Sequence, residues 1–290
     1  MGIVATDLQL LGSRTRYWEY GTPQTGPTIV VVHGYRGDHH GLEPVVNLLE
    51  DFHIISPDLP GFGESTPMTE QPHSIAGYGI WLRAFLDALG LTAGPEPEYV
   101  LLGHSFGSIV VSHAVAGGLP AKAVILINPI ADDPSKVAGI GATKFFYAVG
   151  RRLPERAARA WLSNWLVVRG MSVTLAKTRD RALRRFIHGQ HHAYFSAFGS
   201  RTSVVEGFDA SLSTTVAAVA ERIEQPVLLI AGERDEVAPL AGQFALLEAF
   251  PDARLDVIPG VGHLIHYETP EAAAHAVRAF VTQLRPSGTP

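Results

Sequence analysis

The chain has 290 residues, 46% of them hydrophobic, and a formal net charge of −5 at pH 7. This composition suits one large apolar core, and the negative charge argues against nucleic acid as a partner. There is no cysteine, which excludes disulfides and thiolate metal sites. The first residues lack the pattern of a signal peptide and no apolar run reaches the length of a membrane span, so we expect a cytoplasmic protein.

Strands and helices alternate along most of the sequence. This order predicts an α/β fold: a mostly parallel sheet of about eight strands, covered by helices on both faces. An antiparallel hairpin at 9–20 is expected to enter the sheet. Further strands are predicted at 28–33, 53–56, 99–102, 122–128, 226–231 and 254–258, and helices at 43–50, 75–89, 108–116, 240–249 and 270–284.

The pattern changes between residues 131 and 220, where buried strands give way to helical periods rich in arginine. We interpret this segment as a helical cap inserted after the sixth strand, with residues 1–130 and 221–290 forming the core. A cap placed there would roof the site and enclose the substrate. Four aromatic residues are candidates for the pocket wall, although they could instead pack the cap onto the core: Trp161, Trp165, Phe195 and Phe198.

Three histidines of this segment share one helical face, His188, His191 and His192. Their spacing could hold a metal ion. No carboxylate partner is obvious, however, so a polar helix face is the favoured interpretation and we expect no metal site.

The most informative motif is Gly103-His104-Ser105-Phe106-Gly107, which lies between an apolar strand and a helix. In that context a G-x-S-x-G motif places its serine on a sharp, strained turn that projects from the edge of the sheet. Side chains at the two flanking positions would collide there, and glycine removes them. Ser105 is therefore the candidate nucleophile. The alternative is an ordinary turn in which the serine caps the helix.

A serine hydroxyl needs a base and a group that orients the base. Asp235 follows the strand at 226–231, and His263 lies in a glycine-rich loop after the strand at 254–258. Both loops fall at the edge that carries Ser105. Asp132 and Asp133, after the strand at 122–128, remain alternative positions for the acid. Other histidines are expected to be structural: His33 as a loop brace, His104 pointing away from Ser105, and His266 in loop packing.

An acyl-transfer site also needs donors for the developing oxyanion. The strand at 28–33 ends in His33-Gly34-Tyr35-Arg36-Gly37, a turn whose backbone N–H groups can face the pocket. We nominate the N–H groups of Tyr35 and Phe106. The alternative is a tight turn at His33 and Gly34 without a catalytic part.

Four motifs in this order resemble the α/β-hydrolase superfamily: His33-Gly34, the turn around Ser105, Asp235 after a strand, and His263 after the last strand. The segment Asp58-Leu59-Pro60-Gly61-Phe62-Gly63-Glu64-Ser65 also resembles the loop after the fourth strand in that family, in which the aspartate usually braces the oxyanion loop. The resemblance covers residues 9–285 except the middle segment. It implies the fold, a Ser-His-Asp hydrolytic mechanism and no cofactor.

The expected function is hydrolysis of an ester, or a related acyl bond, of a small to medium apolar substrate. The same triad could instead cleave C–C, amide or lactam bonds or carry out cofactor-free perhydrolysis. A basic residue in the pocket would favour C–C cleavage of a carboxylated substrate, and Arg36 is the candidate. A binding or sensor protein without turnover is a further alternative. The sequence leaves the oligomeric state open.

Overall fold

The computed structural model describes residues 3–22, 26–133 and 139–284. Eight strands form one sheet in the order β1-β2-β4-β3-β5-β6-β7-β8. β2 is antiparallel to both its neighbours, and all pairs from β4 to β8 are parallel, which confirms the predicted fold class. The strands are β1 (Ile3–Leu10), β2 (Ser13–Tyr20), β3 (Thr28–Val32), β4 (Ile54–Pro57), β5 (Tyr99–His104), β6 (Ala123–Ile127), β7 (Val227–Gly232) and β8 (Ala253–Ile258).

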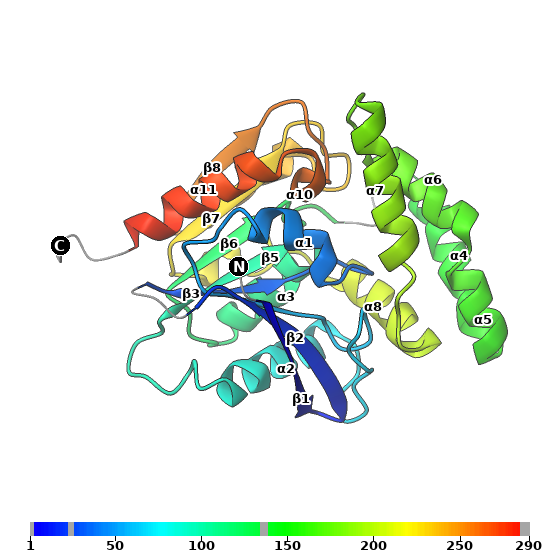
Figure 1. Ribbon diagram of the computed structural model, residues 1–290, viewed down its shortest axis with the longest axis horizontal. Coiled ribbons are helices and arrows are strands. Elements are labelled where there is room, and N and C mark those ends of the chain that lie inside the picture. Colours follow the sequence, from blue (N-terminus) through cyan, green and yellow to red (C-terminus); the bar gives the residue numbers. More distant parts are fainter. Residues whose placement is uncertain (1–2, 23–25, 134–138, 285–290) are drawn as a thin grey trace.

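Helices cover both faces of the sheet (Figure 1). Side chains alternate along each strand, so Val30 and Val32 of β3 join one apolar cluster, and Ile29 and Val31 join another on the opposite face. The first cluster includes residues of α2 (Ile75–Ala88), α3 (Phe106–Ala116) and α9 (Leu240–Ala249). The second includes residues of α1 (His39–Val46) and α11 (Pro270–Gln283).

Element boundaries differ from the sequence-based expectation at two places. The hairpin predicted at 9–20 begins earlier, at Ile3. The sequence did not reveal this start, because β1 is a largely exposed edge strand without a run of buried apolar residues. The helix predicted at 43–50 is α1, which begins at His39 and ends at Val46. It starts early because Asp38 caps it, accepting a hydrogen bond from the N–H of His40.

Between β6 and β7 the chain forms a helical insertion, a name we use for residues 139–213. Its helices are α4 (Ile140–Arg152), α5 (Glu155–Leu162), α6 (Trp165–Leu175), α7 (Arg181–Tyr194) and α8 (Arg201–Ser213). Figure 1 shows α4 to α7 standing together beside the sheet. The insertion after the sixth strand is as predicted, whereas the division into a core and a separate cap at 131–220 stays a prediction.

The chain returns through a 3-10 turn at Ala220–Arg222 to β7. A short helix, α10 (Ile265–Glu268), precedes α11 and was not predicted, since four residues carry too little periodicity. No helix in the described ranges is both long enough and apolar enough to cross a membrane.

Candidate active site

Ser105 occupies the turn between β5 and α3. Its backbone has φ 53° and ψ −116°, a conformation that non-glycine residues rarely adopt. A Cβ on Gly103 would lie 2.5 Å from the carbonyl oxygen of Gly107, and one on Gly107 would lie 2.1 Å from that of Val32. Only glycine therefore allows the chain to turn this sharply. The turn leaves the Ser105 side chain projecting at the carboxyl end of the strands.

His263 lies in the loop between β8 and α10, and its imidazole reaches Ser105. Nε2 of His263 is 2.8 Å from Oγ of Ser105, and Nδ1 is 2.7 Å from Oδ2 of Asp235. A carboxylate only accepts hydrogen bonds, so Nδ1 carries the proton and Nε2 is free to accept from the serine hydroxyl. The three predicted residues are therefore joined in one hydrogen-bonded chain.

Asp235 is held in place by its own loop after β7. Its Oδ1 accepts hydrogen bonds from the backbone N–H groups of Val237, at 2.7 Å, and Ala238, at 3.0 Å. Burial by itself would raise the pKa of Asp235, but the neighbouring His263 and these hydrogen bonds outweigh it and lower the pKa. The carboxylate is thus ionised at neutral pH. The alternative acids, Asp132 and Asp133, are exposed, and the carboxylate bonded to His263 is that of Asp235.

The loop after β3 passes directly over Ser105. A Cβ on Gly34 would lie 3.4 Å from Cβ of Ser105, which brings the following peptide, that of Tyr35, close to the serine. Within the described residues, the N–H groups of Tyr35 and Phe106 donate to no backbone or side-chain acceptor. Both are therefore available to an oxygen atom placed above Ser105.

Two buried residues brace this loop. Nε2 of His33 accepts a hydrogen bond of 2.8 Å from the N–H of Leu59, so the ring proton sits on Nδ1, which donates to the carbonyl of Gly34. Asp58 accepts from the N–H and Nδ1 of His39 and from the N–H of Glu64. The loops after β3 and β4 are thereby fixed to each other, as the sequence resemblance implied for Asp58.

A cavity of about 380 Å³ opens above Ser105. The core contributes the loops that carry Ser105 and His263, and four helices of the insertion contribute walls. The apolar part of the wall consists of Leu42, Phe106, Ile109, Ile130, Ile140, Met171, Leu175, Phe195, Leu212, Val237 and Leu264. An enclosure of this kind excludes water and suits an apolar substrate.

Of the five residues predicted to bind substrate, Phe195 lines the cavity and the other four do not. Trp161 stacks on Phe146 and donates to its carbonyl oxygen, which fixes it inside the insertion. Trp165 is 60% exposed, and Phe198 packs against the core loop through a bridge with Phe62. Helical periodicity indicates which residues share one face of a helix. It does not indicate which face lines the cavity.

Arg36, which was expected to face the substrate, instead contacts the helical insertion. Its guanidinium is buried and donates to the carbonyls of Phe195 and Leu162, at 3.1 and 2.8 Å, and to the hydroxyl of Tyr147, at 3.3 Å. Its backbone also has a positive φ of 58°. Arg36 therefore ties three helices of the insertion to the core loop. Its guanidinium is thus directed into the insertion, and Arg36 is not among the residues that line the cavity.

Five further polar residues line the cavity: Asp38, His104, His191, His266 and Tyr267. The sequence patterns gave His104, His191 and His266 structural roles and did not single out Asp38 or Tyr267. His104 is part of the cavity lining, and its ring centroid lies 5.4 Å from that of His263. Burial lowers the pKa of His104 to about 3 and keeps the ring neutral. In the sequence, only their positions could have suggested a place at the cavity. They lie within a few residues of the catalytic candidates or on the insertion.

The predicted histidine face on α7 is not arranged as a metal centre. Nδ1 of His188 and Nδ1 of His191 both contact the hydroxyl of Ser172, at 2.6 and 2.7 Å, while His192 is exposed. Among the described residues, the one group with donor atoms close enough for an ion is Asp38, His39 and His40, whose donor atoms lie within 4.8 Å of one another.

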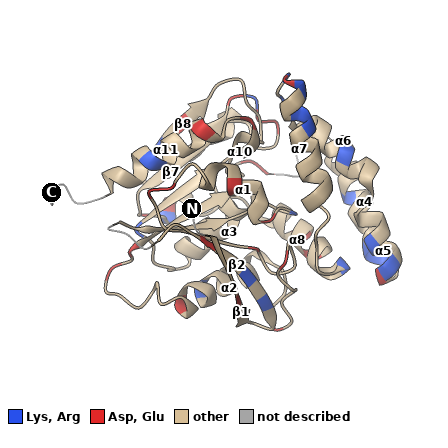
Figure 2. Cartoon of the chain, viewed as in Figure 1, with Lys and Arg blue, Asp and Glu red and all other residues tan. Residues whose placement is uncertain are grey.

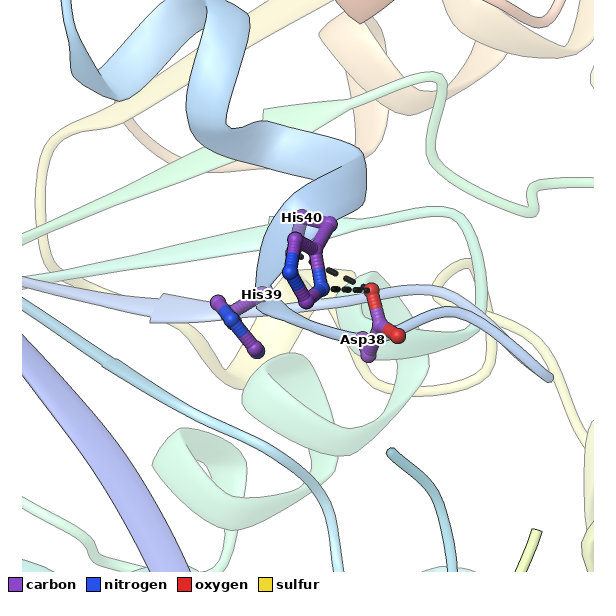
Figure 3. A group of neighbouring side chains, drawn as sticks. All are labelled: Asp38, His39 and His40. Atoms are coloured by element: carbon purple, nitrogen blue, oxygen red, sulfur yellow. Dashed lines mark hydrogen bonds and ion pairs between the residues drawn. The ribbon is translucent and has the colours of Figure 1, made fainter. Parts of the chain in front are cut away.

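Figure 3 shows how this group is arranged. The ring centroids of His39 and His40 lie 3.8 Å apart with the rings tilted by 38°, and each ring stacks on its other side, His39 on Trp18 at 3.3 Å and His40 on Tyr194 at 3.8 Å. Each imidazole therefore has an aromatic ring packed against both of its faces. Nδ1 of His39 is also bonded to Asp58. The group is therefore better described as a column of rings that joins the core to α7.

Comparison with known proteins agrees with this geometry. A sequence model of the alpha/beta hydrolase family matches residues 29–276. A pimeloyl-[acyl-carrier protein] methyl ester esterase from Xanthomonas campestris pv. campestris is 27% identical over 271 residues, which cover 89% of this chain and 96% of the relative.

Two solved structures share the fold. An esterase from Thermogutta terrifontis has a TM-score of 0.78 at 21% identity, covering 97% of this chain and 99% of that one. An enol-lactonase from Burkholderia xenovorans has a TM-score of 0.78 at 18% identity, covering 96% and 100%. With a family match across most of its length, and with the turn at Ser105, Asp235 and His263 in their expected order, the chain belongs to the alpha/beta hydrolase family.

Proposed function

We propose that the protein hydrolyses carboxylic esters of small to medium, mainly apolar substrates, with Ser105, His263 and Asp235 as the catalytic triad. The observation that carries the proposal is the hydrogen-bonded chain from Ser105 through His263 to Asp235 at the base of a largely apolar cavity. The relative named as a methyl ester esterase supports the same type of bond.

In this mechanism Ser105 attacks the ester carbonyl while Nε2 of His263 removes its proton. Asp235 stabilises the imidazolium that forms and keeps the ring oriented. His263 then returns the proton to the departing alcohol, leaving an acyl group on Ser105. Water activated by the same imidazole attacks the acyl-enzyme and releases the acid. Every proton moves through Nε2, and the residues require no cofactor for these steps.

The oxyanion would be bound by the backbone N–H groups of Tyr35 and Phe106. Support comes from their lack of other acceptors in the described structure and from the close passage of the Gly34 loop over Ser105. Donors fixed in advance stabilise the developing charge more effectively than water, which must reorient. The braces from His33 and Asp58 would hold one of the two donors in position.

Ester hydrolysis is favoured over C–C cleavage of a carboxylated substrate. The basic residue that would have argued for C–C cleavage, Arg36, has its guanidinium engaged with the insertion. No corresponding observation favours an amide, lactam or perhydrolysis substrate.

A labelling experiment tests the proposal. The wild-type protein should react covalently with a fluorophosphonate probe at Ser105 and hydrolyse p-nitrophenyl esters. Ser105→Ala should lose the label and reduce kcat by a factor on the order of 10⁴ or more, with the fold retained. Ser108→Ala is the matched control, because Ser108 bonds to the backbone of Ser105 rather than to His263. Labelling at another serine in Ser105→Ala would refute the assignment.

A further inference from the structure

The cavity has a second region of unlike character, which we call the polar wall and define as Asp38, His191, His266 and Tyr267. Asp38 precedes α1, His191 lies on α7, and the other two lie on α10. The ring of Tyr267 lies 4.3 Å from that of His266 and 5.8 Å from that of His191. Three elements distant in sequence therefore bring polar side chains together beside Ser105.

These side chains are buried, yet much of their hydrogen-bonding capacity is unused. His266 is 5% exposed and makes no hydrogen bond through either ring nitrogen with any described residue. The hydroxyl of Tyr267 and Oδ2 of Asp38 are likewise free of partners in the described structure, and His191 uses Nδ1 alone, on Ser172. An unpaired buried polar group costs roughly 1–3 kcal/mol. Nδ1 of His266 is such a group, and it shares the cavity wall with three further polar atoms that have no partner among the described residues. This combination points to a ligand group that pairs with them.

The charges at the wall indicate the chemistry of that group. Burial opposes ionisation of Asp38, but the hydrogen bond and charge of His40 outweigh it and lower the pKa, so the wall carries a carboxylate. Burial lowers the pKa of His191 to about 4 and that of His266 well below its usual value, so both imidazoles are neutral. None of the four wall residues carries a positive charge, and His40, the partner of Asp38, lies outside the cavity lining, so a substrate anion at the wall would face the Asp38 carboxylate.

A hydroxyl group matches this set of atoms. It donates one hydrogen bond, which a carboxylate accepts, and it accepts up to two, which a neutral imidazole N–H and a tyrosine hydroxyl can donate. We propose that the polar wall is a specificity subsite for an uncharged hydroxyl group, so that the preferred substrates are hydroxylated esters rather than plain or carboxylated ones. The inference rests on the proposed ester hydrolysis and names its substrate class.

A matched set of six-carbon esters tests it: methyl hexanoate, methyl 3-hydroxyhexanoate, methyl 6-hydroxyhexanoate and monomethyl adipate, with acid release followed by titration. Propyl and 3-hydroxypropyl hexanoate place the hydroxyl on the alcohol side instead. At least one hydroxylated ester should exceed its parent in kcat/KM by about 10-fold or more, and the carboxylated ester should fall about 10-fold below methyl hexanoate. The two series show which half of the substrate reaches the wall.

Variants then connect the preference to the wall. Tyr267→Phe and Asp38→Asn should each reduce the ratio of kcat/KM between the hydroxylated ester and its parent by about 5-fold or more. Asp38→Asn should also weaken discrimination against monomethyl adipate, and asparagine can still cap α1. Tyr194→Phe is the control, since Tyr194 stacks on His40 outside the cavity, and its ratio should not change. If Asp38→Asn fails to fold, Tyr267→Phe and the wild-type ratios still decide.

The outcomes separate the two proposals. Equal kcat/KM for the hydroxylated and parent esters in both series, or a preference for the adipate ester, would overturn the subsite while leaving ester hydrolysis intact. If no ester is hydrolysed and Ser105 is not labelled by a fluorophosphonate, the proposed function itself fails.

Discussion

The core and the helical insertion meet at the same cavity but are built by different means. In the core, Ser105, His263 and Asp235 sit on loops at strand ends, and each is fixed by hydrogen bonds to backbone or to one another. The insertion contributes mainly apolar walls, and its outward side leaves Phe145, Trp165, Leu166 and Phe186 exposed. Hydrogen bonds therefore position the residues of the proposed reaction, whereas apolar packing determines the shape of the cavity that would hold the substrate.

The two regions also differ in charge. Residues 139–213 contain 12 Lys and Arg but 4 Asp and Glu, against totals of 23 and 28 for the chain. The insertion is therefore basic and the remainder strongly acidic. Figure 2 shows the blue Lys and Arg on α5, α6 and α7, away from the sheet. The overall charge of −5 conceals this division.

The largest effect should come from the acid of the core. Asp235→Asn keeps the shape of the side chain but removes the carboxylate that fixes the tautomer of His263, so kcat should fall roughly 10²- to 10⁴-fold. Asp132→Asn is the control. Near-native activity of Asp235→Asn, together with loss in Asp132→Asn or Asp133→Asn, would move the acid to the loop after β6. Steady-state kinetics with a p-nitrophenyl ester measures both.

The second-largest effect should come from Arg36, which connects the core to the insertion. Arg36→Met removes three hydrogen bonds from a buried charged group to α4, α5 and α7. The free energy of unfolding should drop by about 3 kcal/mol, because bonds to charged groups contribute roughly 1.5–3 kcal/mol each and part is recovered by relaxation. Urea denaturation measures it. The exposed Arg152→Met, whose bond is local, should change stability by less than about 0.5 kcal/mol. Equal losses would contradict the role of Arg36.

A smaller effect concerns acid sensitivity of the insertion. The folded-state pKa of His191 is about 4, below the ordinary value of 6.5. As pH falls below 6.5 the unfolded chain binds a proton that the folded chain does not, so stability decreases with falling pH until about pH 4. His191→Gln should therefore lessen the stability lost between pH 6.5 and 5 by about 2 kcal/mol.

Urea titrations at the two pH values measure this difference. The matched control is His192→Gln, because His192 is the exposed neighbour on the same helix. An identical change in both variants would show that burial of His191 is not the cause.

The smallest expected effect separates the inner from the outer side of the insertion. Phe195→Ala truncates a side chain of the wall and so enlarges the cavity. The ratio of kcat/KM between C8 and C4 esters should shift by about 10-fold, since each methylene in such a pocket contributes roughly 1–3 kcal/mol of discrimination. Trp165→Ala removes an exposed ring and should leave the ratio within roughly 2-fold. A shift in Trp165→Ala alone would reverse the assignment of the two sides.

The sequence by itself determined the sheet, the order of its elements and the candidates Ser105, Asp235 and His263. Those features depend on local patterns: apolar runs of strand length, glycines that permit a sharp turn, and loops that must follow strand ends. Boundaries were less accurate where local signals were weak, as in the exposed strand β1 and in α1, whose start depends on Asp38.

The tertiary structure alone decided which side chains line the cavity. Arg36 has the same neighbours in sequence whether its guanidinium faces a substrate or the carbonyls of Leu162 and Phe195, and only the placement of the insertion settles which. His266 and Asp38 lie 228 positions apart in sequence and share one wall because α1 and α10 pack together. Contacts between distant segments leave no periodicity in a single sequence, so a polar wall made from three elements becomes visible only when the chain is folded.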